Sequence, residues 1–205
     1  TSGSPPLSTV LPSPVTSTTG FVVMRCRILI LLCLLVSSVA AHAARTVLVF
    51  GDSLSAGYGI RKDAAWPALL QQRLVEKRLD YSVANASISG ETTAGGRSRI
   101  AEALSRHQPA VVVIALGAND GLRGLPVARM KENLAATIAA SRKGGARVLL
   151  VGMMLPPNYG AYAGDFREAF AEIAKREKVP LVPFLLDGVA TDPRLFQSDT
   201  IHPTA

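Results

Sequence analysis

The stretch that decides the fold is Ala110-Val111-Val112-Val113-Ile114-Ala115-Leu116, an unbroken apolar run of strand length. A strand buried on both faces shows no alternation of polar and apolar residues, and such strands are typical of parallel sheets covered by helices. The polar sequence Gly117-Ala118-Asn119-Asp120 follows it directly. The run therefore predicts an interior strand of a parallel sheet, with polar residues at its carboxyl end.

Short apolar runs alternate with longer amphipathic segments on both sides of this strand. The predicted strands are residues 46–50, 81–85, 110–116, 147–151 and 180–184. The predicted helices, which show apolar residues near a 3.6-residue period, are residues 64–79, 95–107, 127–142 and 164–178. This alternation predicts a three-layer α/β/α domain with a central parallel sheet and helices on both faces.

Polar and glycine-rich clusters follow several of the predicted strands. Ligands of open parallel sheets bind beyond the carboxyl ends of the strands. The clusters are Gly51-Asp52-Ser53-Leu54-Ser55, Ala86-Ser87-Ile88-Ser89-Gly90-Glu91, Gly117-Ala118-Asn119-Asp120 and Asp199-Thr200-Ile201-His202-Pro203. Each cluster alone is an ordinary turn. Four of them at one predicted edge of one sheet indicate a functional site.

The histidines narrow the chemistry that such a site can perform. A serine hydroxyl needs a base during attack on a carbonyl carbon, and histidine is the usual base because its pKa lies near neutrality. The chain has three histidines: His42, His107 and His202. His42 lies in an expected leader, and His107 is placed to support a helix terminus. In one turn, Asp199 can reach one ring nitrogen of His202 while the other nitrogen faces Ser53.

Four blocks of this sequence resemble, in the same order, the motif blocks of the SGNH or GDSL hydrolase superfamily. They are Val49-Phe50-Gly51-Asp52-Ser53-Leu54-Ser55-Ala56-Gly57-Tyr58, Asn85-Ala86-Ser87-Ile88-Ser89-Gly90-Glu91-Thr92-Thr93, Leu116-Gly117-Ala118-Asn119-Asp120-Gly121-Leu122-Arg123-Gly124 and Asp199-Thr200-Ile201-His202-Pro203. Ala65-Trp66-Pro67-Ala68-Leu69-Leu70 and Leu155-Pro156-Pro157-Asn158-Tyr159-Gly160 resemble a bacterial periplasmic branch of it. That branch combines thioesterase, arylesterase and lysophospholipase activities.

The resemblance implies a flavodoxin-like fold and a role for each site residue. Ser53 would be the nucleophile, His202 the general base and Asp199 its orienting partner. The oxyanion would be held by the backbone N–H groups of Ser53 and Gly90 and by the side-chain amide of Asn119. The residue types suit these roles, since glycine lets the backbone approach a ligand closely and asparagine is a donor that does not titrate. No cofactor is implied, and two histidines without cysteines in residues 44–205 leave few transition-metal ligands.

The expected activity is hydrolysis of acyl esters and thioesters, including aryl esters, acyl-CoA and lysophospholipids, through an acyl-serine intermediate. Leu122, Leu155, Pro156 and Tyr159 are candidates for the wall of the acyl pocket. A carbohydrate O-acetylesterase or O-acetyltransferase is the alternative, although only 5% of the residues are aromatic. A noncatalytic binding module is expected to lack at least one site residue, and all of them are present.

The amino-terminal residues indicate an exported protein. Met24, Arg25 and Arg27 precede an apolar run over residues 28–36, and Ala41-His42-Ala43 forms an A-x-A site. The run is shorter than the roughly 20 residues of a membrane span. We expect a disordered or upstream lead at 1–23, a signal peptide at 24–43 and a hydrolase domain at 44–205. The mature protein would be periplasmic or secreted, without stable membrane insertion.

Charge and chain length give the remaining expectations. The net charge is +7, and removal of residues 1–43, which hold two of the 22 basic residues and no acidic ones, leaves 20 against 15, or +5. No basic run interleaved with aromatics indicates nucleic-acid binding. We expect a monomer acting on a small substrate. In the resembled superfamily a helix follows the histidine block, whereas only Pro203-Thr204-Ala205 follow here. We therefore expect the carboxyl-terminal helix to be missing: either the sequence is a fragment, or one face of the sheet is partly uncovered.

Overall fold

The computed structural model describes residues 1–3 and 44–205. Residues 44–205 form one compact unit, which is the unit described below. The predicted signal peptide, and the predicted lead apart from its first three residues, lie outside the described residues. Among the helices in the described part of the chain, none combines the length and apolar character needed to cross a bilayer.

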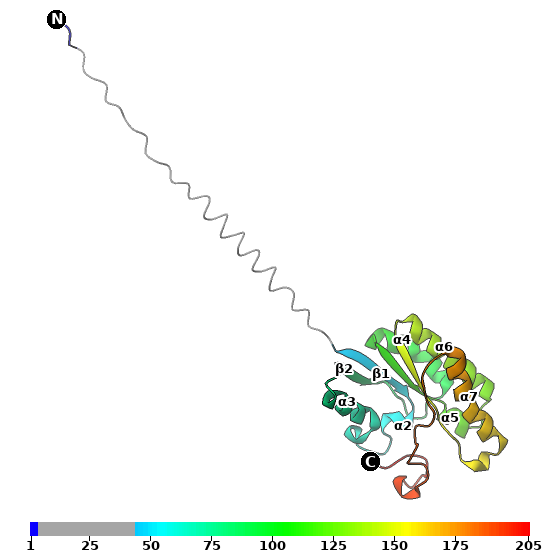
Figure 1. Cartoon of the computed structure of the whole chain (residues 1–205). Coiled ribbons are helices and arrows are strands. Elements are labelled where there is room, and N and C mark those ends of the chain that lie inside the picture. Colours follow the sequence, from blue (N-terminus) through cyan, green and yellow to red (C-terminus); the bar gives the residue numbers. More distant parts are fainter. Residues whose placement is uncertain (4–43) are drawn as a thin grey trace. The chain divides into compact units, whose positions relative to one another are not determined.

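Five parallel strands form the central sheet (Figure 1). They are β1 (Arg45–Gly51), β2 (Tyr81–Asn85), β3 (Val111–Ala115), β4 (Arg147–Val151) and β5 (Leu181–Val182), in the spatial order β2-β1-β3-β4-β5. The apolar run that predicted an interior strand forms β3, which pairs with β1 on one side and β4 on the other. Val112 and Ile114 are completely buried, because helices and neighbouring strands enclose them.

Helices cover both faces of the sheet. The principal ones are α3 (Trp66–Glu76), α4 (Thr93–His107), α6 (Val127–Lys143) and α7 (Ala161–Glu177). In Figure 1, α4, α6 and α7 lie on one face of the sheet and α3 on the other. The larger core gathers around Phe50, Leu134 and Phe170 on the first face, and Trp66 and Leu70 of α3 pack on the second. The predicted three-layer α/β/α fold with a central parallel sheet is therefore confirmed.

Several boundaries differ from those predicted, for local reasons. β5 has two residues rather than five, because Pro180 and Pro183 lack the N–H that a strand donates to its neighbour. α4 begins two residues early, because the Thr92 side chain accepts a hydrogen bond from the Gly95 N–H and caps the first turn. After α7, the described residues contain β5, turns and the short 3₁₀ helix η3 (Pro193–Leu195), with no further α-helix.

Two short helices at the carboxyl edge of the sheet were not predicted. α2 (Ser53–Ala56) begins one residue beyond β1, and α5 (Ala118–Leu122) begins shortly after β3. The register of the two strands pairs Gly51 with Ala115, so both strands end at the same level. This register brings the start of α2 and the start of α5 to one edge, where the polar clusters meet.

Candidate active site

Ser53, His202 and Asp199 form a continuous chain of hydrogen bonds at the carboxyl edge of the sheet. The distance between Ser53 Oγ and His202 Nε2 is 2.8 Å, and that between His202 Nδ1 and Asp199 Oδ2 is 2.7 Å. An ionised carboxylate can only accept, so Nδ1 carries the proton that is donated to Asp199. In neutral His202 the free Nε2 then accepts from the Ser53 hydroxyl, which is the arrangement a general base requires.

Asp199 is held in its ionised form by its own turn. Its Oδ1 accepts the backbone N–H groups of His202 at 3.0 Å and Ile201 at 2.9 Å. These two bonds and the bond from the His202 ring lower the pKa of Asp199 to about 2, with the His202 backbone bond as the largest cause. The carboxylate is therefore charged at neutral pH and stabilises a protonated imidazole beside it.

The turn that carries His202 is tied to the segment that follows Ser53. The Gln197 side-chain amide donates to the backbone oxygens of Tyr58 at 2.8 Å and of Pro203 at 2.9 Å, and its backbone N–H donates to His202 O. The Tyr58 ring lies against the imidazole, with 4.5 Å between the ring centroids. From the sequence, Tyr58 was named only as the last residue of the nucleophile block, without a role, and Gln197 was not named. Gln197 is 139 residues from Tyr58, and no local pattern links them.

Ser53 is placed by the turn between β1 and α2. The carboxylate of Asp52, which is 2% exposed, accepts the Leu54 N–H at 3.1 Å and caps α2. Burial raises the pKa of Asp52 to about 6, against the lowering effects of the Leu54 bond and of His202. A side chain at Gly51 would come within 2.9 Å of the Ala115 carbonyl oxygen, so the tight exit from β1 requires glycine there.

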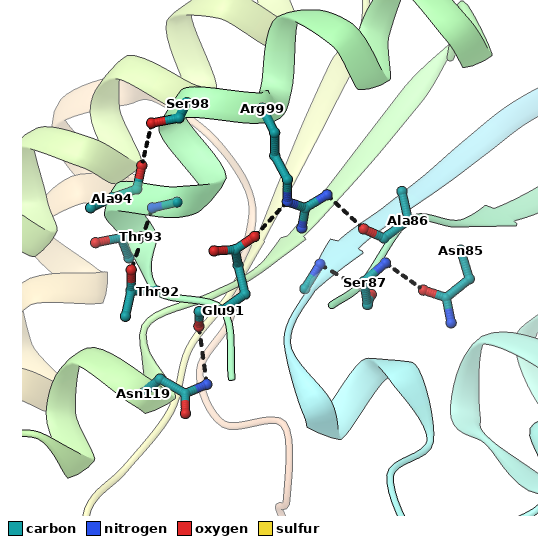
Figure 2. Close-up of polar contacts among 12 residues, drawn as sticks. Asn85, Ala86, Ser87, Glu91, Thr92, Thr93, Ala94, Ser98, Arg99 and Asn119 are labelled. Atoms are coloured by element: carbon teal, nitrogen blue, oxygen red, sulfur yellow. Dashed lines mark hydrogen bonds and ion pairs between the residues drawn. The ribbon is translucent and has the colours of Figure 1, made fainter. Parts of the chain in front are cut away.

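Two of the three predicted oxyanion donors, Gly90 and Asn119, belong to segments that are joined by a hydrogen bond. The Asn119 side-chain amide donates to Glu91 O at 3.0 Å (Figure 2), and Gly90 is the residue before Glu91 in the sequence. One N–H of an amide suffices for this bond, so the second remains for a ligand. Gly90 has φ +79°, a conformation that favours glycine. Among the backbone hydrogen bonds of residues 44–205, none uses the Gly90 N–H as donor.

Buried Asp120 joins the same two segments from behind. Its carboxylate accepts the backbone N–H of Thr93 at 2.8 Å and the Thr93 hydroxyl at 2.6 Å. Asp120 is 3% exposed, and Thr93 begins α4. These bonds hold α5, which carries Asn119, against the start of α4. The contacts of Asp120 are therefore structural ones.

An apolar cavity of about 680 Å³ opens beside the Ser53 hydroxyl. Three predicted wall residues, Leu122, Leu155 and Pro156, line it. Tyr159, the fourth, is not among the lining residues, and its hydroxyl donates to Leu122 O at 3.3 Å. The lining residues that were not proposed as wall are Leu54, Ala118, Met153, Met154, Pro157, Phe184, Leu186, Ala190, Pro193, Phe196, Thr200 and Ile201.

Comparison with known families assigns the chain to one of them. The profile of the GDSL-like Lipase/Acylhydrolase family matches residues 49–205, a span that contains Ser53, Asn119, Asp199 and His202. The chain belongs to this family. The superfamily that the four motif blocks predicted is therefore confirmed, and so is the predicted class of enzyme, an acyl hydrolase.

Individual members of the GDSL-like lipase/acylhydrolase family are similar over most of the chain. Esterase TesA from Pseudomonas aeruginosa is 49% identical over 162 residues, which are 78% of this chain and 81% of that protein. Thioesterase 1/protease 1/lysophospholipase L1 from Escherichia coli K12 is 43% identical over 80% of this chain and 77% of its own. A crystal structure of the psychrotrophic esterase EstA from Pseudoalteromonas sp., inhibited by monoethylphosphonate, superposes with a TM-score of 0.75 at 38% identity, covering 78% of this chain and 88% of EstA.

Proposed function

We propose that this GDSL-family protein hydrolyses acyl esters and thioesters through an acyl intermediate on Ser53. The observation that carries the proposal is the relay from Ser53 Oγ to His202 Nε2 and from His202 Nδ1 to Asp199, with distances of 2.8 and 2.7 Å. The relay opens onto an apolar cavity that can hold an acyl chain. A nucleophile, its base and a substrate-sized space thus occur together.

The reaction divides into two half-reactions that use the same groups. In acylation, Ser53 Oγ bonds to the acyl carbon while His202 Nε2 takes the hydroxyl proton. Collapse of the tetrahedral intermediate breaks the bond to the alcohol or thiol, which leaves with the proton from His202. In deacylation, His202 takes a proton from water, whose oxygen attacks the acyl carbon. The bond between the acyl carbon and Ser53 Oγ then breaks, the free acid leaves, and Ser53 Oγ takes the proton from His202.

The negative charge that develops on the carbonyl oxygen needs donors that are already in place. The Asn119 amide has one N–H beyond its bond to Glu91 O. We assign this N–H and the backbone N–H groups of Ser53 and Gly90 to the oxyanion. Donors of this kind contribute because they need no rearrangement during the reaction.

The cavity favours a fatty acyl group over a sugar. Its lining is aliphatic, aromatic or thioether apart from Ser53, Asn119, Thr200 and His202. The names of the relatives, an esterase and a thioesterase that is also a lysophospholipase, support the same substrate classes here. We therefore propose aryl esters, acyl-CoA and lysophospholipids as substrates, and a carbohydrate O-acetyl group as a poorer one.

A substrate panel tests the proposal. Purified protein is assayed with p-nitrophenyl esters of increasing chain length, acyl-CoA, lysophospholipid and an O-acetylated polysaccharide, with Ser53→Ala as the control. We expect turnover of the first three classes and none above background in the control. Turnover of the polysaccharide alone would reassign the enzyme to carbohydrate deacetylation, and turnover that survives in the control would reject Ser53.

We further propose that the enzyme is exported and acts in the periplasm or outside the cell as a monomer. The support is the basic start, apolar run and A-x-A site within residues 24–43. Amino-terminal sequencing of protein from a cell-envelope fraction, with light scattering of the same sample, tests this. A mature chain that begins near Ala44 is expected, and an intact Met24 terminus would favour a membrane anchor instead.

A further inference from the structure

The ion pair between Arg99 and Glu91 lies behind the predicted oxyanion donors. The distance between Arg99 Nε and Glu91 Oε2 is 2.6 Å, and the side chains are 20% and 13% exposed. The other side-chain ion pairs with Lys or Arg in residues 44–205 have at least one partner more than half exposed. A pair sheltered from water loses less of its attraction to screening, so it can hold a defined geometry.

Arg99 holds both ends of the loop that carries Gly90. Its Nη1 donates to Ala86 O at 2.7 Å, at the beginning of the loop, while its Nε binds Glu91 at the end (Figure 2). The guanidinium also lies 4.0 Å above the ring centroid of Phe50, which is completely buried. The Arg99 side chain thus connects the loop over residues 86–91 to the buried ring of Phe50.

Glu91 links the contacts of Arg99 to Asn119. Its carboxylate binds Arg99, and its backbone oxygen accepts the Asn119 amide at 3.0 Å. Gly90, another predicted donor, is the residue before Glu91. Gly90 and Asn119 are therefore both connected to Glu91, whose carboxylate Arg99 binds.

Gly95 leaves the space that the Glu91 carboxylate occupies. A methyl group at residue 95 would lie within 3 Å of both the carboxylate carbon and one of its oxygens. Gly95 belongs to the first turn of α4, where a negative charge is favourable. A glycine in a helix costs stability relative to alanine, and here the missing side chain admits the carboxylate.

Resting on the proposed function, we propose that Arg99 and Glu91 are a positioning pair that sets Gly90 and Asn119 for the oxyanion. Neither side chain need touch the substrate. Their loss misplaces donors whose value depends on being aligned in advance, so it lowers kcat more than it raises KM. The loop keeps a second anchor in the bonds between Thr93 and Asp120, so variants of the pair are expected to fold.

The test uses the whole enzyme with Arg99→Met, Arg99→Lys and Glu91→Gln. Arg106→Met is the matched control, because Arg106 pairs with Glu102 on the same helix but both side chains are more than 60% exposed. With a p-nitrophenyl ester we expect roughly tenfold lower kcat for Arg99→Met and Glu91→Gln with KM within about twofold, partial recovery in Arg99→Lys, and no change in the control. Unchanged kcat in Arg99→Met, or a change confined to KM, would overturn the proposal.

A double-mutant cycle separates positioning from simple destabilisation. If Arg99 acts through the oxyanion donors, Arg99→Met lowers kcat less in an Asn119→Ala background than in the wild type. Equal fold-changes in the two backgrounds would overturn the proposal. If Arg99→Met does not fold, the nearly isosteric Glu91→Gln takes its place in the cycle. Activity that survives in Ser53→Ala would reject the proposed function itself, which distinguishes that failure from failure of the pair.

Discussion

The aromatic ring of Tyr58 lies against the imidazole of His202, with 4.5 Å between the ring centroids and 39° between the ring planes. Tyr58 follows α2, the helix that begins with Ser53, so one short segment supplies both the nucleophile and a wall for its base. The ring limits the tilt of the imidazole while Asp199 fixes its rotation. Orientation of the base is thus shared between a carboxylate and an aromatic face.

Replacing Tyr58 with alanine is expected to lower kcat by about two- to tenfold, which corresponds to an aromatic contact of about 0.5–1.5 kcal/mol. Tyr58→Phe keeps the ring and is expected to retain wild-type kcat. Steady-state kinetics with a p-nitrophenyl ester measure both. Equal losses in the two variants would show that the hydroxyl, and not the ring, matters.

Replacing Ser53 with alanine is expected to lower ester turnover by several orders of magnitude, because no other group in the relay can form the acyl intermediate. Circular dichroism should show an unchanged fold, since Ser53 is only partly buried and Asp52 still caps α2. An organophosphonate should label Ser53 in the wild type and leave the variant unlabelled. Label on another residue of the wild type would reassign the nucleophile.

Replacing Asn119 with alanine is expected to lower kcat by on the order of a hundredfold with a much smaller change in KM, because its amide acts mainly on the charge of the transition state. The kinetic constants are compared with those of Asn119→Asp, which keeps the shape but replaces the donor with a carboxylate. A loss confined to KM would show that Asn119 binds substrate instead.

The raised pKa of Asp52 predicts an unusual pH dependence of the free energy of unfolding. Burial raises its pKa from 3.8 to about 6, so the folded protein binds the Asp52 proton more tightly than the unfolded chain does. The resulting stabilisation is complete below pH 3.8 and is lost as pH rises through about 6. Relative to a protein without this group, the free energy of unfolding should fall by on the order of 3 kcal/mol across that interval.

Asp52→Asn provides the comparison, since the asparagine oxygen can still accept the Leu54 N–H while no proton titrates. Urea unfolding of both proteins between pH 4 and 7 gives the difference at each pH. Asp199, whose pKa is lowered to about 2, contributes in the opposite direction, but it is common to both proteins and cancels. A pH-independent difference would show that Asp52 does not titrate in this range.

Much of the fold followed from patterns within single segments. The run over residues 110–116 predicted the central strand β3, and helical periodicity predicted α3, α4, α6 and α7. Where local chemistry was overlooked, the prediction was wrong: two prolines shorten β5, and the Thr92 cap lengthens α4. The short helices α2 and α5 were missed because four or five residues are too few to show a helical period.

The sequence by itself determined that the polar clusters after β1, β2 and β3 lie together, because parallel strands end at one edge of the sheet. Only the tertiary structure decided how those residues meet. Tyr159, in a motif beside the pocket, turns its hydroxyl to Leu122 O, while Met153 and Met154 line the cavity. Arg99 fastens the oxyanion loop, and Gln197 ties the His202 turn to Tyr58. Contacts of this kind depend on the direction of side chains across long separations in sequence, which periodicity along the chain does not encode.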